Sequence, residues 1–156
     1  MEPVRVGVIG IGSMGKNHAR VCAELPQIEL VGIVDVDEAR VRPLAERYHT
    51  TYYRDYRELY DKVEAVVIVS PTPLHYQIAL DFLERGIHVL VEKPITVDVE
   101  QAKELVAAAK HRNLVLQVGH LERFNPAVMK LKQIVGEPAL IECHRLSGPT
   151  TRNLDV

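Results

Sequence analysis

The first residues with a spacing suited to chemistry form one turn, Gly10-Ile11-Gly12-Ser13-Met14-Gly15. The turn follows an apolar run, residues 4–9, that is typical of a buried strand, and it precedes a segment with a helical pattern. A strand, a G-x-G-x-x-G turn and a helix together hold the pyrophosphate of a dinucleotide. Gly10 allows the tight turn, Gly12 lets the backbone approach the phosphates, and Gly15 lets the helix pack close to the sheet. We therefore predict that all six residues contact a dinucleotide at the N-terminus of the helix.

An acidic residue lies where the adenosine ribose of such a ligand is bound. Asp35 follows Gly15 by 20 residues, at the end of a second apolar run, residues 28–34. A carboxylate there accepts hydrogen bonds from the ribose hydroxyls and repels a 2′-phosphate, so we predict NAD in preference to NADP. NADP stays an alternative because Arg40 and Arg42 lie close in sequence, and an arginine near the ribose can hold a 2′-phosphate. Asp35 could instead merely start the turn before the second helix.

The candidate for catalysis is Lys93, in the segment Glu92-Lys93-Pro94 that follows the apolar run 87–91. A lysine beside a nicotinamide ring can pass a proton to or from a substrate hydroxyl while a hydride moves to the ring. Burial in a cleft would favour the neutral amine that this role needs. Pro94 restricts Lys93 to extended backbone, which helps to aim the side chain, and Glu92 could orient the ribose or Lys93 itself. The alternative is an exposed Glu-Lys pair in a loop.

Apolar runs and helical patterns alternate along the chain, which predicts a doubly wound parallel sheet of the Rossmann type, with helices on both faces. The expected strands are residues 4–9, 28–34, 50–53, 65–69, 87–91 and 114–118. Ligands of such sheets bind beyond the carboxyl ends of the strands. The residues that follow those ends are the glycine turn, Asp35, the loop from Ser70 to His75, residues 92–94 and Gly119-His120. We therefore predict one site along one sheet edge.

The composition narrows the class of protein. Hydrophobic residues make up 47% and charged residues 26%, as in ordinary globular domains, and the net charge is −2. This charge gives no reason to expect nucleic acid or an anionic membrane as a partner, and no apolar run approaches the roughly 18 residues that span a bilayer. Cys22 and Cys143 form no motif, and Cys22 falls on the apolar stripe of the first helix. We expect a cytoplasmic protein.

The pattern changes after Val118. A helix is expected from Asn125-Pro126 to about Val135, and residues 139–146 have the pattern of a strand. The remaining residues are polar and end without a closing element, and an isolated final strand would leave open edges. We therefore predict a dinucleotide-binding domain at residues 1–120, followed at 121–156 by the first helix and strand of a truncated second α/β domain.

Three motifs, in this order, resemble the Gfo/Idh/MocA oxidoreductases. They are the glycine turn, Ser70-Pro71-Thr72-Pro73-Leu74-His75 and Glu92-Lys93-Pro94. The resemblance covers the whole chain and implies an NAD(P)-binding Rossmann domain, then an α/β substrate domain through whose large open sheet the complete enzyme forms homo-oligomers. It implies that Lys93 is the catalytic lysine and that His75 and Glu92 lie by the nicotinamide and its ribose. The other predicted cofactor contacts on the same edge are Ser70, Thr72, Pro73, Lys93 and His120.

A second stretch narrows the resemblance within the family. Residues 119–128, GHLERFNPAV, are similar to the segment after the sixth strand in nucleotide-sugar members, which oxidise the 3-hydroxyl of UDP-N-acetylglucosamine or a related sugar. The resemblance implies that Lys93, Arg123 and Asn125 contact a sugar or UDP-sugar substrate, and an arginine suits its anionic diphosphate. The family's further catalytic histidine lies in the second domain and has no counterpart here. Asn125 could instead be only the N-cap of the following helix.

The alternatives to a dehydrogenase are an NAD(H)-sensing module and a metal site. A Rossmann module without a substrate domain could sense NAD(H) and report the redox state to a partner protein. A metal site of His120, Cys143 and His144 lacks metal-like spacing, and adjacent residues of a strand point to opposite faces. We therefore predict no metal, and we favour an enzyme over the sensing module.

Overall fold

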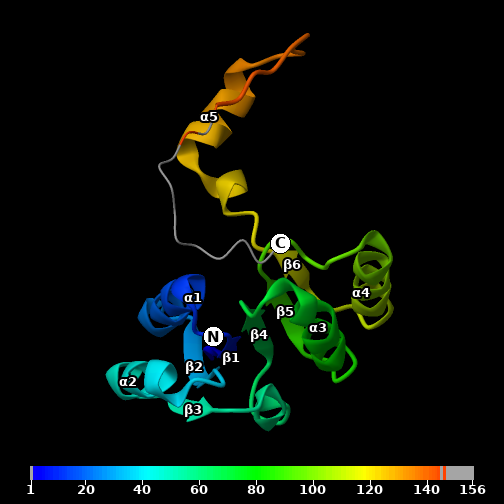
Figure 1. The fold of residues 1–156 in the computed structure, drawn as a ribbon. Coiled ribbons are helices and arrows are strands. Elements are labelled where there is room, and N and C mark those ends of the chain that lie inside the picture. Colours follow the sequence, from blue (N-terminus) through cyan, green and yellow to red (C-terminus); the bar gives the residue numbers. More distant parts are fainter. Residues whose placement is uncertain (1, 145, 147–156) are drawn as a thin grey trace. The chain divides into compact units, whose positions relative to one another are not determined.

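A computed structural model describes residues 2–144 and 146, and these fall into two compact units, one that ends at Gly119 and one that begins at His120. The first unit is built on a six-stranded sheet (Figure 1). Its strands are β1 (Val4–Ile9), β2 (Ile28–Val34), β3 (Thr51–Tyr53), β4 (Ala65–Ile68), β5 (His88–Val91) and β6 (Leu116–Val118). Its helices are α1 (Ser13–Glu24), α2 (Glu38–Tyr48), α3 (His75–Leu83) and α4 (Val99–His111), with 3-10 turns η1 (Tyr56–Leu59) and η2 (Thr72–Leu74).

The strand order is β3-β2-β1-β4-β5-β6, and every neighbouring pair is parallel. The chain therefore winds outward from β1 to β3, returns to pair β4 with β1, and then winds outward the other way. The order reverses between β1 and β4, the place where open α/β sheets bind their ligands. The predicted doubly wound Rossmann fold is confirmed.

Alternate residues of the neighbouring strands β4 and β5 belong to different hydrophobic cores. Val66 and Ile68 of β4 belong to the core that holds Phe82 of α3, whereas Val67 belongs to the core that holds Cys22 of α1. Helices α1 and α2 cover one face of the sheet, and α3 and α4 cover the other (Figure 1). Because the sheet is covered on both faces, its central strands read as continuous apolar runs in the sequence.

Cys22 is a core residue, as the sequence pattern predicts. Its side chain is 5% exposed, and burial raises the pKa of the thiol to about 11. The thiol therefore stays protonated at neutral pH and packs as a small apolar group.

The helices begin in two different ways. Asp37 accepts a hydrogen bond from Arg40 N at the start of α2, and Asp98 accepts one from Gln101 N at the start of α4. In contrast, α1 begins after Gly12, which has no side chain to accept from the first turn. Uncapped N–H groups at a helix start are ready to bind an anion, so this difference matters for the site. In the described ranges no helix is long and apolar enough to cross a membrane.

The second unit contains the 3-10 turn η3 (Leu121–Phe124) and the helix α5 (Pro126–Ile134), which matches the helix expected after Asn125. The strand predicted at 139–146 is wrong wherever the chain is described, because residues 139–144 and 146 adopt no strand conformation. A strand forms only against a partner, and the described residues of this unit supply no other strand. The argument from strand faces against a metal site at Cys143 and His144 therefore no longer applies. Residues 145 and 147–156 lie outside the described part.

The two phenylalanines of the chain give a matched test of the core between α3 and the sheet. Phe82 is fully buried between α3 and the sheet, whereas Phe124 is 68% exposed. We expect Phe82→Ala to lower the free energy of unfolding by about 3–5 kcal/mol, because it removes apolar contacts and leaves a cavity. Phe124→Ala should change it by less than about 0.5 kcal/mol. Urea unfolding followed by circular dichroism measures both, and equal losses would contradict the assigned core.

Candidate functional site

The backbone hydrogen bonds of the sheet continue for one residue beyond the ends of β1, β2, β5 and β6. The residues that follow these strands therefore lie along one edge of the sheet. Each of these residues donates its backbone N–H to the last residues of the neighbouring strand. The pairs are Gly10 to Val34 (2.8 Å), Asp35 to Tyr53 (3.2 Å), Glu92 to Ile68 (2.9 Å) and Gly119 to Val91 (2.8 Å). The glycine loop (residues 10–15), Asp35 and the Glu-Lys-Pro turn (residues 92–94) therefore share the carboxyl edge of the sheet.

Two glycines let α1 start directly behind β1. Gly10 has φ +88°, a left-handed conformation that favours glycine. A Cβ on Gly15 would lie 1.9 Å from the carbonyl oxygen of Gly10, so the helix reaches this position only without a side chain there. The close contact between Gly15 and Gly10 brings the N-terminus of α1 up to the sheet edge.

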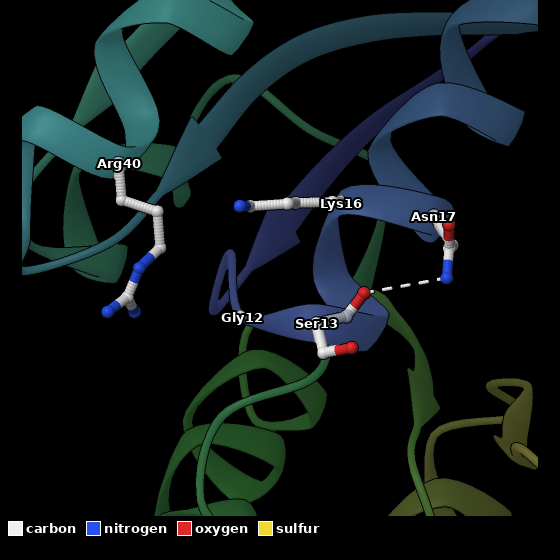
Figure 2. Close-up of a pocket in the computed structure, with 5 residues that line it drawn as sticks. All are labelled: Gly12, Ser13, Lys16, Asn17 and Arg40. Atoms are coloured by element: carbon white, nitrogen blue, oxygen red, sulfur yellow. Dashed lines mark hydrogen bonds between the residues drawn. The ribbon is translucent and has the colours of Figure 1, made fainter. Parts of the chain in front are cut away.

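Gly12 faces open space, unlike its two partners. A Cβ built on Gly12 meets no atom within 4 Å, and no acidic residue lies in the first turn of α1. A pocket of about 610 Å³ lies here, lined by Gly12, Ser13, Lys16, Asn17 and Arg40. Figure 2 shows Lys16 of α1 and Arg40 of α2 beside this space. Free helix N–H groups and the cation of Lys16 suit a diphosphate, so these residues fit a dinucleotide.

Asp35 ties the glycine loop to the end of β2. Its side chain is buried, at 8% exposed, and Oδ2 accepts a hydrogen bond from Ile11 N at 2.7 Å. Oδ1 accepts one from Asp37 N at 2.9 Å, and the Arg40 guanidinium lies 3.6 Å from Oδ2. The carboxylate therefore has a structural role in addition to the predicted contact with ribose.

The remaining residues of the glycine loop differ in what they can offer a ligand. Ile11 has a fully buried side chain in the core under α1, so only its backbone can face the site. Met14 is half-buried, and Ser13 is exposed and lines the pocket.

His75 joins the loop 70–75 to the Glu-Lys-Pro turn. The ring is 1% exposed, with Nε2 2.7 Å from the carbonyl oxygen of Ser70 and Nδ1 2.9 Å from that of Pro94. The imidazole is thus occupied by backbone on both sides. The Ser70 hydroxyl is enclosed without a hydrogen-bond partner in the described structure, while Thr72 is half-buried and Pro73 is exposed.

Lys93 and its neighbour Glu92 have opposite environments. Glu92 is 7% exposed, and its Oε2 accepts a hydrogen bond from Lys93 N at 3.1 Å. The side chain of Lys93 is exposed, so the expected burial of this amine is wrong for this structure. The peptide bond between Lys93 and Pro94 is cis. A buried carboxylate therefore anchors the backbone from which an exposed amine projects.

Three predicted site residues belong to the second unit. His120 and Arg123 are exposed. Asn125 caps α5: its Oδ1 accepts a hydrogen bond from Ala127 N at 3.0 Å, and its Nδ2 donates to Glu122 Oε2 at 2.8 Å. The alternative prediction of Asn125 as an N-cap is thus observed.

The sequence patterns did not select every residue at this edge. Lys16 and Asn17 line the pocket, and their only signal was their place directly after the last glycine of the loop. The Nε2 atom of His18 lies 2.9 Å from Glu92 Oε1. These two residues are 74 positions apart, so no local pattern could pair them.

Fold and site together define a dinucleotide-binding domain at residues 1–119. A family model described as an oxidoreductase family with an NAD-binding Rossmann fold matches residues 4–120. The chain belongs to this family, the Gfo/Idh/MocA oxidoreductases.

Several relatives have assigned activities. The chain is 37% identical over its whole length to UDP-N-acetylglucosamine 3-dehydrogenase of Acidithiobacillus ferrooxidans, and covers 50% of that protein. It is 37% identical to inositol 2-dehydrogenase of Rubrobacter xylanophilus, with 89% of this chain and 41% of that protein aligned. Scyllo-inositol dehydrogenase of Lactobacillus casei, solved with NAD(H) and scyllo-inositol, matches with a TM-score of 0.80 and 28% identity over 85% of this chain and 40% of that one. The chain spans half or less of the length of these relatives.

A matched pair of glycine variants tests the two roles in the loop. Gly15→Ala should lower the free energy of unfolding by about 1–3 kcal/mol, because the new methyl group collides with the backbone of Gly10. Gly12→Ala should change it by less than about 1 kcal/mol and still weaken NADH binding about tenfold or more, because the methyl group occupies space that the phosphates need. Urea unfolding and titration calorimetry measure the two effects. Wild-type NADH affinity in Gly12→Ala would contradict the site.

Proposed function

We propose that this chain is the cofactor-binding part of an NAD-dependent dehydrogenase that oxidises a hydroxyl group of a sugar or nucleotide sugar. The observation that carries the proposal is the position of Lys93, an exposed amine on the same sheet edge as the glycine loop. Two relatives support it, because their names describe dehydrogenases of inositol and of UDP-N-acetylglucosamine. Oxidation of an alcohol by hydride transfer needs a proton-transfer group beside the cofactor.

In the proposed reaction the substrate alcohol loses a hydride from its carbon and a proton from its hydroxyl group. Bound NAD supplies the ring that accepts the hydride from the carbon. The neutral amine of Lys93 would take the hydroxyl proton on its Nζ, and the resulting ammonium would return it in the reverse reaction. The exposed amine is accessible to a substrate, while the hydrogen bond from Lys93 N to Glu92 fixes the backbone beneath it. His75 supports the same turn, because its ring contacts both Ser70 O and Pro94 O and so links the loop 70–75 to the turn.

We infer NAD rather than NADP from the charges around the pocket. The Asp35 carboxylate lies at the end of β2, where it would face a ribose, and its charge repels a 2′-phosphate. Arg40 is the residue that could favour the phosphate. Its guanidinium lies 3.6 Å from Asp35 and 3.3 Å from Asp37, so two carboxylates already balance its charge.

For the substrate we propose a UDP-N-acetyl sugar oxidised at its 3-hydroxyl. The support is the 37% identity over the whole chain to a UDP-N-acetylglucosamine 3-dehydrogenase. Residues 121–156 would open the substrate domain, where the exposed Arg123 can bind a diphosphate. Asn125 would contribute through the start of α5, which it caps. The cofactor contact of His120, the homo-oligomeric parent and the cytoplasmic location stay predictions.

Asp35→Ser tests the cofactor preference. We expect weaker NADH binding and stronger NADPH binding, with the ratio of the two dissociation constants changed about tenfold or more, because the variant removes both the ribose acceptor and the repelling charge. Titration calorimetry measures both constants. Asp35→Asn is the matched control for shape, since it removes the charge and keeps an oxygen that can accept from Ile11 N. Unchanged affinities for both cofactors in Asp35→Ser would refute the role.

Lys93→Met tests the catalytic assignment. In the complete protein that contains this chain, we expect turnover with UDP-N-acetylglucosamine to fall about 100-fold or more, because the proton acceptor is lost. NADH affinity should stay within about twofold, because Lys93 does not line the pocket of the glycine loop. Lys103→Met, at an exposed lysine of α4, is the matched control and should keep wild-type turnover. Full activity in Lys93→Met would remove Lys93 from the mechanism, and activity with inositol alone would overturn the UDP-sugar substrate.

A further inference from the structure

His18 contacts the Glu-Lys-Pro turn from a different element. It lies on α1, three residues after Gly15, and its Nε2 is 2.9 Å from Glu92 Oε1. Both side chains are largely buried. A carboxylate oxygen only accepts, so Nε2 carries the hydrogen and donates it.

The Glu92 carboxylate is enclosed by three elements of the first unit. Its Oε1 faces His18 of α1, and its Oε2 accepts from Lys93 N at the end of β5. Gly119, just past β6, leaves the room: a Cβ there would lie 2.8 Å from Oε1 and 3.1 Å from Oε2. The carboxylate therefore occupies space that only a glycine at position 119 leaves open.

A carboxylate in this position needs a donor for each oxygen, because an unpaired buried charge is costly. In the described structure His18 is the side chain that donates to Oε1. Without that donor, the carboxylate would turn toward solvent to regain hydration. This rotation would also take Oε2 away from the backbone N–H of Lys93.

We propose that His18 is a positioning residue, which holds Glu92 so that Glu92 in turn fixes the backbone of Lys93. The inference rests on the proposed catalytic role of Lys93 and adds a residue to that site. It links α1, whose N-terminus lies at the proposed phosphate site, to the proposed proton-transfer group. His18 acts through Glu92 and itself lies outside the lining of the pocket.

A purely structural role for His18 makes a different prediction. His18 falls on the apolar stripe of α1, so a side chain of similar size that only packs would replace it without effect on Lys93. His18→Phe keeps an aromatic ring and removes the donor. His18→Gln keeps a donor at a similar reach and removes the ring. The two variants therefore separate packing from hydrogen bonding.

The test measures amide hydrogen exchange in the 156-residue chain by NMR, which requires neither cofactor nor turnover. We expect the Lys93 amide of His18→Phe to exchange about tenfold faster than in the wild type, because its acceptor is displaced. In His18→Gln the rate should stay within about twofold. The Gly119 amide, which donates to Val91 on the same edge, is the internal control and should keep its protection in both variants.

An unchanged Lys93 amide in a folded His18→Phe variant overturns the proposal, and so does faster exchange in His18→Gln. If His18→Phe does not fold, His18→Gln decides by the same criterion. In the complete enzyme, His18→Phe should lower kcat about tenfold with little change in the KM for NAD, and His18→Gln should restore kcat. A wild-type enzyme without dehydrogenase activity would refute the proposed function, whereas the amide measurement would still decide the contact between His18 and Glu92.

Discussion

The contact between Gly15 and the backbone of Gly10 is the constraint on which the site depends. A Cβ at position 15 would lie only 1.9 Å from the Gly10 carbonyl oxygen, so only glycine there permits α1 to start so close behind β1. This approach brings the uncapped N-terminus of α1 to the carboxyl edge of the sheet, at the reversal of strand order. Asp35 then fixes the loop through Ile11 N. The positive end of the helix dipole, the free N–H groups and the open space at Gly12 therefore lie at the same place, the N-terminus of α1.

The rest of the edge is held together by buried polar contacts. His18 pairs with Glu92 across 74 positions of sequence, and His75 contacts the backbone on both of its sides. The first contact joins α1 to the turn after β5, and the second joins the loop after β4 to that same turn. The side chain of Lys93, in contrast, is exposed. A rigid backbone that carries a free amine fits the proposed transfer of a proton to and from a substrate that enters from solvent.

Local patterns predicted the strands of the first unit, its sheet edge and the capping of α5 by Asn125, because burial on both faces and capping leave local signals in the sequence. They failed where the outcome depends on distant partners. The pairing of His18 with Glu92 leaves no local signal. The strand expected at 139–146 has the right residue types, but the described residues of its unit give it no strand to pair with. The expected burial of Lys93 likewise depended on surroundings that no single segment specifies.

Titration calorimetry of NADH and NADPH against the 156-residue chain tests whether the glycine loop and Asp35 form a working NAD site. We expect saturable binding of NADH and clearly weaker binding of NADPH. Because all the residues proposed for the adenosine and phosphate contacts lie within the first unit, a folded chain should bind without substrate. A folded chain that binds neither cofactor would contradict the assignment of this site.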